Sequence, residues 1–229
     1  MMRLVRFCTG LLLLPLCCAA SRAVWALLND TAAAAPFFNP PAFAFLAGCL
    51  VWMVFWIFLP MPVRSYVLAH EATHALWGLL FGSRIRDFRV HAQGGSVKLT
   101  KTNVLITLAP YFFPLYTLLV ILIRWIAVSC LDCRDYPLVW LFTIGLTWMF
   151  HVTFTLQSLS TRQPDIEEYG TCFSWVFIYL LNVFGVGLWI VCSTPATVAL
   201  FFEKLLLYTH HAYAWVYVHG LTLLRWLHV

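Results

Sequence analysis

The chain alternates between long stretches without a charged side chain and short polar segments. Asp, Glu, Lys and Arg are absent from five stretches, and Glu71 is the only charged residue between positions 65 and 83. A helix that crosses a membrane needs about 20 predominantly apolar residues. The charge-free stretches are 31–63, 102–123, 136–161, 169–202 and 205–224. Together with the stretch around Glu71, they predict about six transmembrane helices, near residues 42–59, 62–82, 103–126, 136–158, 171–195 and 205–224.

The segment 83–101 departs from this pattern because it is polar and partly alternating. Phe88 and Val90 come before Gln93-Gly94-Gly95-Ser96, and Val97 and Leu99 come after it. Alternation on both sides of a glycine-containing turn is typical of a β-hairpin. The predicted fold class is therefore an all-α polytopic membrane protein with a short β-hairpin after the helix at 62–82.

The N-terminus has the features of a membrane anchor or a signal peptide. Arg3 and Arg6 precede the apolar stretch 7–20, a basic-then-apolar pattern that both kinds of segment share. The apolar character continues past Arg22 to Leu28, which favours an uncleaved anchor. We therefore expect three parts: an N-terminal anchor or signal-like segment at 1–30, a membrane core at 31–202, and a transmembrane or interfacial helix at 203–229.

Composition supports a lipid environment. Of the 229 residues, 62% are hydrophobic and 10% are charged, and the mean hydropathy is +0.86. Soluble domains carry about 25% charged residues. The chain is thus predicted to be an integral, multi-pass protein of the lipid bilayer. Its net charge of +5 is spread over short loops, which argues against a nucleic-acid partner.

The basic residues also bear on orientation. Cytoplasmic loops of membrane proteins are enriched in Lys and Arg. This rule places Arg3 and Arg6 on the cytoplasmic side, and also the hairpin with its five basic residues. Three predicted helices separate the two segments, so both cannot be cytoplasmic. One of the intervening segments must be cleaved, re-entrant or wrongly assigned.

Three ionisable residues interrupt the apolar run at 62–82. His70, Glu71 and His74 form the pattern H-E-x-x-H. In a helix, residues i and i+4 lie on one face, so both imidazoles can bind one ion. In such sites the two histidines bind zinc and the glutamate acts as general base toward a water molecule. A structural role is the alternative, with the histidines bonded to neighbouring helices and Glu71 paired with an arginine.

The order of motifs resembles a known family. HEATHALWGLLFG in an apolar helix, then the glycine-containing hairpin DFRVHAQGGSVKL, then further apolar helices look like the site-2-protease-like intramembrane zinc metallopeptidases. The resemblance covers about residues 60–190 by motif order. TLAPYFFPL, at 107–115, lies where that family has Ala-Gly-Pro-x-x-Asn. The Ala109–Pro110 step is present here, and the glycine and asparagine are absent.

The resemblance also implies a third metal ligand. Zinc hydrolases usually have three protein ligands and one open position. The family supplies an aspartate from a later segment, and its counterpart here is Asp165 in Gln163-Pro164-Asp165-Ile166, where Ile166 replaces the family's glycine. Asp165 can reach the ion only if the chain breaks near Pro164 and folds back. His151, on the predicted helix 136–158, is the alternative third ligand.

These observations lead to three functional hypotheses. The resemblance implies a zinc metalloendopeptidase that hydrolyses a peptide bond in or near the membrane, with His70, His74 and Asp165 or His151 as ligands, Glu71 as base, and a membrane protein or peptide as substrate. The changes at Ile166 and at 107–115 instead suit an inactive scaffold or regulator derived from such a protease. A metal transporter is the third hypothesis, although no ladder of ionisable residues crosses the membrane.

Overall fold

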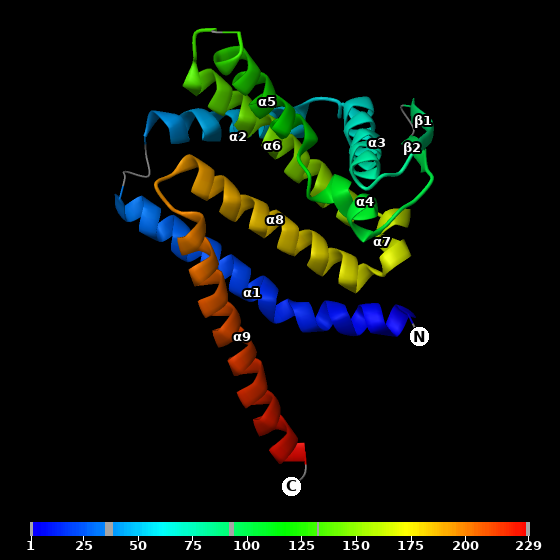
Figure 1. Ribbon diagram of the computed structural model, residues 1–229, viewed down its shortest axis with the longest axis vertical. Coiled ribbons are helices and arrows are strands. Elements are labelled where there is room, and N and C mark those ends of the chain that lie inside the picture. The colour runs from blue at the N-terminus through cyan, green and yellow to red at the C-terminus, as the bar shows by residue number, and fades with distance from the viewer. Residues whose placement is uncertain (1, 35–38, 92–93, 132, 228–229) are drawn as a thin grey trace. The chain divides into compact units, whose positions relative to one another are not determined.

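The protein is almost entirely helical, with one small β-sheet (Figure 1). The computed structural model describes residues 2–34, 39–91, 94–131 and 133–227. The predicted helical fold with a hairpin after the H-E-x-x-H helix is confirmed. In chain order the elements are α1 (Met2–Ala34), α2 (Pro40–Phe58), α3 (Val63–Leu80), β1 (Ile85–His91), β2 (Gly94–Leu99), α4 (Val104–Leu108), the 3₁₀ turn η1 (Ala109–Tyr111), α5 (Leu115–Ser129), α6 (Pro137–Leu159), α7 (Pro164–Tyr169), α8 (Thr171–Ser193) and α9 (Val198–Leu227).

Four of the described helices are long and apolar enough to cross a membrane, which indicates a membrane protein. They are Met2–Thr31 within α1, together with α2, α6 and α8. Val104–Tyr111 and Leu115–Ser129 form a fifth candidate if this pair, bent by 82°, counts as one span. Six spans are therefore not confirmed. Among the described helices, α3 and α9 do not qualify: α3 contains Arg64 and Glu71 besides its two histidines, and the charge-free part of α9 contains several histidines and tyrosines, which lower its mean hydropathy.

The predicted single helix over 103–126 is wrong, because the structure has two helices with a break between them. The α4–η1 segment ends at Tyr111 and α5 begins at Leu115. Pro110 and Pro114 bracket the break. Proline has no backbone N–H to continue the helical ladder, and it disfavours helical geometry in the residue before it. The two prolines thus account for the bend inside an otherwise continuous apolar run.

The chain forms two compact units, and the predicted division at residues 30 and 202 stays a prediction. Residues 1–36 and 166–229 form the first unit, and residues 37–165 form the second. In the first unit, α1 packs with α8 and α9 around a buried cluster, and Lys204 forms an ion pair with Asp30 at 2.6 Å. The buried residues of this cluster are Ala23, Val24, Leu27, Ile190 and Phe201.

Close packing of α2 against α6 organises the second unit. A Cβ atom added to Gly48 would lie 1.9 Å from the Phe142 carbonyl oxygen, and one added to Gly145 would lie 2.0 Å from the Phe45 carbonyl oxygen. Small residues at such crossings let helix backbones approach closely. One side of the crossing is filled by Trp52, whose Nε1–H donates to Thr153 Oγ1 at 2.9 Å and whose ring packs on Phe150 and Phe154.

The hairpin lies along α3 in the second unit. The strands are antiparallel, and Ile85 pairs with Leu99 and His91 with Gly94. The predicted turn residues Gly94 and Gly95 therefore belong to strand β2, and Gln93 lies outside the described residues. Added Cβ atoms at Gly78 of α3 and at Gly95 would meet Leu99 and the Glu71 side chain, respectively. The hairpin is thus seated on the helix that carries H-E-x-x-H.

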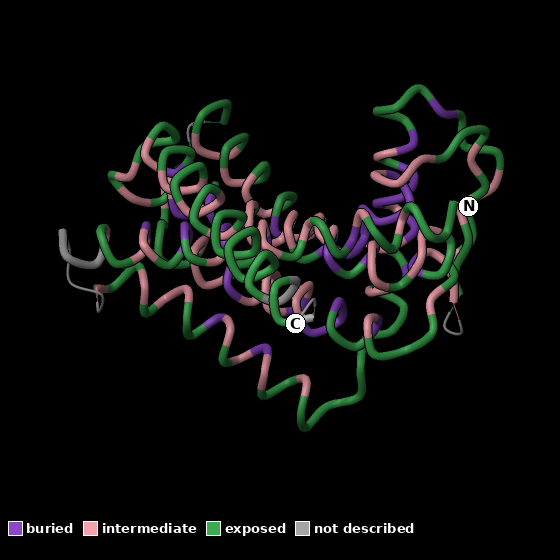
Figure 2. The backbone as a smooth tube through the Cα atoms, turned by 90° about the horizontal axis from the view of Figure 1, so that it is seen from below, coloured by how far each residue is buried: buried purple, intermediate pink, exposed green. Residues whose placement is uncertain are grey.

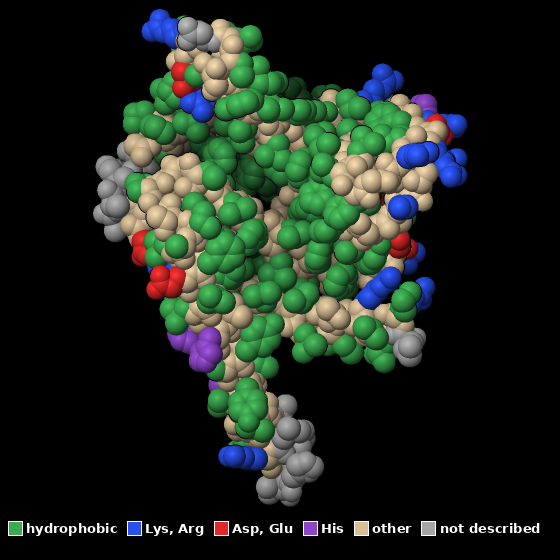
Figure 3. Space-filling view, viewed as in Figure 1, with side chains coloured by type: hydrophobic (Ala, Val, Ile, Leu, Met, Phe, Trp, Pro, Cys, Tyr) green, Lys and Arg blue, Asp and Glu red, His purple; other side chains and the backbone are tan. Residues whose placement is uncertain are grey.

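The surface has the composition expected for a chain surrounded by lipid. Large hydrophobic side chains are exposed along the candidate spans, among them Leu50, Val54 and Phe58 of α2. Figure 2 shows buried positions alternating with exposed ones along the helices. In Figure 3 hydrophobic side chains cover most of the visible face. Lys and Arg are concentrated on the hairpin segment, where Arg84, Arg86, Arg89, Lys98 and Lys101 are all exposed.

Candidate metal centre

The structure brings together three potential ligand atoms from α3 and α7. His70 Nε2 lies 3.2 Å from His74 Nε2 and 3.2 Å from Asp165 Oδ2. His74 Nε2 lies 3.4 Å from Asp165 Oδ2. Within the described parts of the chain, this is the only cluster of three or more His, Cys, Asp or Glu side chains close enough to share one ion. All three residues lie in the second unit.

The spacing of these atoms is close to that in a tetrahedral zinc site. Zinc binds histidine nitrogen and carboxylate oxygen at about 2.0–2.2 Å. Two ligands of a tetrahedron at that radius are about 3.3–3.6 Å apart. The three observed separations, 3.2, 3.2 and 3.4 Å, are close to this range, and they are also the separations of hydrogen bonds and ion pairs among these side chains. The three atoms are therefore close enough together to bind one ion.

Asp165 reaches the histidines because the chain reverses after α6. That helix ends at Leu159, and Pro164 begins the short helix α7. Proline is well suited to the first position of a helix, where its missing N–H has no partner to lose. Asp165 follows directly, so its carboxylate is carried back toward α3. The break near Pro164 that the sequence requires for this ligand is present.

Each histidine is also held through its second ring nitrogen. His74 Nδ1 lies 2.9 Å from the carbonyl oxygen of Ile106. A carbonyl can only accept, so Nδ1 carries a proton, and in the neutral ring Nε2 would have its lone pair free for an ion. His70 Nδ1 lies 3.4 Å from Tyr66 Oη, which in turn bonds Ser158 Oγ. Such partners orient metal-binding histidines.

The carboxylate of Asp165 is stabilised in its ionised form. Burial alone would raise its pKa, but hydrogen bonds and charge interactions with His70 and His74 outweigh burial and lower the pKa below its usual range. Tyr111 Oη also donates to Asp165 Oδ2 at 3.1 Å. Asp165 is therefore an anion at neutral pH and presents a negative oxygen toward two imidazoles, an arrangement that suits a cation at their centre.

Glu71 lies beside this cluster under the hairpin. It is buried, and it is close enough to His70, His74 and Asp165 to interact electrostatically with all three. A Cβ at Gly95 would lie only 2.6 Å from Glu71 Cγ, so strand β2 closes over the glutamate side chain. A buried carboxylate next to a cation site is the arrangement that a general base requires.

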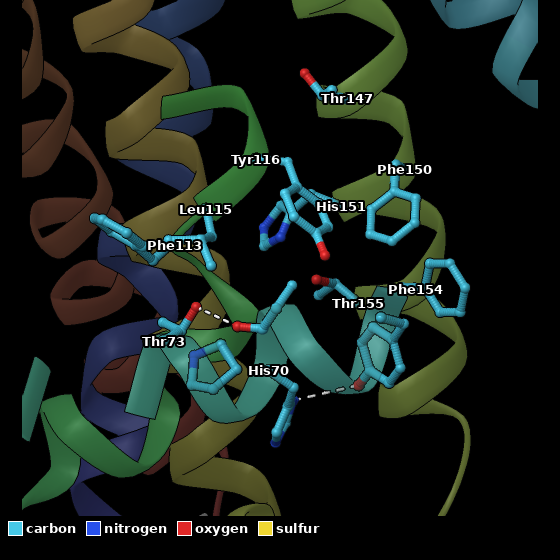
Figure 4. A pocket seen from close by; sticks show the side chains of 13 residues that line it. His70, Thr73, Phe113, Leu115, Tyr116, Thr147, Phe150, His151, Phe154 and Thr155 are labelled. Atoms are coloured by element: carbon cyan, nitrogen blue, oxygen red, sulfur yellow. Dashed lines mark hydrogen bonds between the residues drawn. The ribbon is translucent and has the colours of Figure 1, made fainter. Parts of the chain in front are cut away.

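The alternative ligand His151 is outside the cluster. It lines a neighbouring cavity of about 20 Å³, which is room for about one water molecule. The cavity is also lined by His70, Thr73 and Thr155. In Figure 4 the His70 ring projects from α3 away from the His151 ring. Of the two candidates for the third ligand, the structure therefore brings Asp165 to the histidine pair.

Sequence reasoning missed the residues that support the ligands. Tyr66 lies four residues before His70 in α3, a helical spacing that is visible in the sequence. Ile106 and Tyr111, by contrast, are 32 and 54 residues distant from their respective partners His74 and Asp165. No local pattern encodes contacts of this range. The available signal was the pair of prolines around Tyr111, which marks a break in an apolar run where backbone and side chains can turn toward a polar site.

Searches against models of protein families, against curated proteins and against solved structures found no match to this chain.

Proposed function

We propose that this protein is an integral, multi-pass membrane zinc metallopeptidase that hydrolyses a peptide bond in or near the membrane. The observation that supports the proposal most is the close spacing of His70 Nε2, His74 Nε2 and Asp165 Oδ2 next to the buried carboxylate of Glu71. Two neutral imidazoles, one carboxylate and an open corner are the ligand set of a hydrolytic zinc site. The substrate is a membrane protein or peptide.

The chemistry divides between the ion and the chain. Zinc would supply a Lewis acid that lowers the pKa of water and polarises the scissile carbonyl. His70, His74 and Asp165 would hold it, with His74 oriented by the Ile106 carbonyl. Glu71 would take a proton from the attacking water as the water oxygen bonds to the carbonyl carbon. Glu71 would then deliver that proton to the amine nitrogen as the C–N bond breaks.

The first experiment is the metal content of purified protein. We would purify the chain in detergent without a histidine tag and wash it with a chelator, because the exposed histidines of α9 can retain metal from an affinity resin. Zinc per chain would be measured for wild type, His74→Ala, Asp165→Ala and His151→Ala. We expect about one zinc in wild type and in His151→Ala, and a loss of most zinc in the other two.

The His151→Ala variant is the matched control, because it removes a histidine that lines the adjoining cavity but not the cluster. Circular dichroism and gel filtration would show whether each variant is folded. A folded wild type that binds no zinc after supplementation would overturn the proposal. Equal zinc loss in His151→Ala and Asp165→Ala would mean that the ligand set is wrong.

A further inference from the structure

The segment Val104–Tyr111 is a rigid buried support beside the metal centre. Ile106, Leu108, Ala109 and Tyr111 are each at most 1% exposed. Asn103 caps the segment, and its side chain accepts a hydrogen bond from the Ile106 backbone N–H at 2.9 Å. Side chains and carbonyls on such a packed, capped segment have little freedom to move. Any group that it directs at the site is therefore held in one place.

This segment contacts all three candidate ligand residues. The Ile106 carbonyl oxygen accepts a bond from His74 Nδ1 at 2.9 Å. Tyr111 Oη donates to Asp165 Oδ2 at 3.1 Å, and the Tyr111 ring meets the His70 ring edge-to-face with centroids 5.4 Å apart. The backbone of the segment thus orients one ligand, and its tyrosine contacts the other two.

Asp165 needs such support more than the histidines do. His70 and His74 project from the middle of an 18-residue helix, whereas Asp165 is the second residue of a six-residue helix after a turn. Its ionised carboxylate can only accept hydrogen bonds. A bond from the Tyr111 hydroxyl uses one lone pair of Oδ2 and leaves another for the ion. It also limits rotation of the carboxylate.

We propose that Tyr111 is a positioning residue for the metal centre: its hydroxyl fixes the Asp165 carboxylate with Oδ2 directed at the ion. This inference rests on the zinc site of the proposed function. Partners of this kind typically change metal affinity by about 10–100-fold when they are removed. Tyr111 acts through Asp165, so its contribution depends on Asp165 being present.

The experiment measures zinc affinity by competition with a fluorescent chelator on the full chain in detergent. We expect Tyr111→Phe to bind zinc about 10–100-fold more weakly than wild type, still at about one ion per chain. Cobalt(II) substituted into the site should show an altered visible absorption spectrum in this variant, because the spectrum reports ligand geometry. The matched control is Tyr116→Phe, which removes a hydroxyl that donates to the Ser65 carbonyl at 2.7 Å, outside the ligand cluster. It should leave affinity and spectrum unchanged.

A double-mutant cycle with Asp165→Ala separates positioning from general stability. If Tyr111 acts through Asp165, adding Tyr111→Phe to Asp165→Ala should weaken zinc binding further by less than about twofold. Equal losses in the two backgrounds, or wild-type affinity in Tyr111→Phe, would overturn the positioning role while leaving the zinc site intact. A wild-type protein that binds no zinc would overturn both the site and this inference.

Discussion

Replacing Glu71 by glutamine should strongly reduce the peptide hydrolysis proposed for this protein and leave the proposed zinc content unchanged. The amide has the shape of the carboxylate but cannot take a proton from water. General acid–base catalysis typically contributes about 10²–10⁴-fold to a rate, and we expect a loss of this size. Glu71 is not one of the three clustered ligand residues, so about one zinc per chain should remain.

The assay would use purified protein in detergent with β-casein and a panel of synthetic single-span membrane peptides. New amino termini would be labelled and quantified by mass spectrometry. Glu203→Gln, an exposed glutamate on α9, is the matched control and should cleave like wild type. Undiminished cleavage by Glu71→Gln would exclude this residue as the base. Zinc in both proteins without cleavage of any probe would favour the inactive scaffold or regulator.

Replacing Gly145 by alanine should separate α2 from α6 and destabilise the second unit by about 3 kcal/mol, near the upper end for overpacked sites. The added Cβ would lie 2.0 Å from the Phe45 carbonyl oxygen. A backbone atom cannot move aside as a flexible side chain can, so the helices must shift. That shift would disturb the nearby packing of Trp52 on Phe150, whose ring centroids are 4.9 Å apart. Gly48→Ala should act similarly.

The transition can be followed by tryptophan fluorescence during thermal unfolding in detergent. Gly185→Ala in α8 is the control, because a Cβ there has no atom within 4 Å. Alanine is the better helix former by about 1 kcal/mol, so this control should be at least as stable as wild type. A Gly145→Ala protein with an unchanged midpoint would show that the α2–α6 crossing is looser than the structure describes.

The sequence predicted those parts of the fold that depend on local pattern. Charge-free stretches located α2 at 42–59 against the observed Pro40–Phe58, and α8 at 171–195 against Thr171–Ser193. The same criterion could not reveal the break at Pro114, because apolar composition continues through it. It also assigned α3 as a span. The 18-residue helix α3 is long enough, but Arg64 and Glu71 help to lower its mean hydropathy below what a membrane span needs.

The candidate site likewise has one part that local sequence pattern predicts and another part that only the fold reveals. The i, i+4 spacing of His70 and His74 is a local property of a helix, and it follows from the sequence alone. Asp165 was a candidate third ligand because Pro164-Asp165 resembles the family's aspartate motif. The sequence left His151 open as the alternative, and only the fold shows which of the two lies beside the histidine pair. The Tyr111 hydroxyl and the Ile106 carbonyl enter the site through packing between distant segments, which periodicity does not encode.

The helix α3 is not among the candidate spans. The number of candidate membrane crossings between Arg3 and the hairpin is therefore two, and not the three that the sequence predicts. If α1 and α2 each cross, Arg3 and the hairpin lie on the same face, and the conflict between their charges disappears. The hairpin and Asp165 both pack against α3, so they share a face as well. If α6 also crosses once, the bent pair Val104–Tyr111 and Leu115–Ser129 must cross the membrane as one span. It cannot then be a re-entrant loop that returns to the face from which it started.

This topology places nine of the fourteen Lys and Arg residues on the face that carries the metal centre: Arg3, Arg6, Arg64, Arg84, Arg86, Arg89, Lys98, Lys101 and Arg162. From the positive-inside rule we expect that face to be cytoplasmic. A membrane-impermeant maleimide applied outside intact cells should therefore label Cys133, which is exposed beyond α5, and should not label a cysteine introduced at His91. The reverse labelling would invert the topology. Under the proposed function, the candidate metal centre would then take its water from the cytoplasm and release its products there.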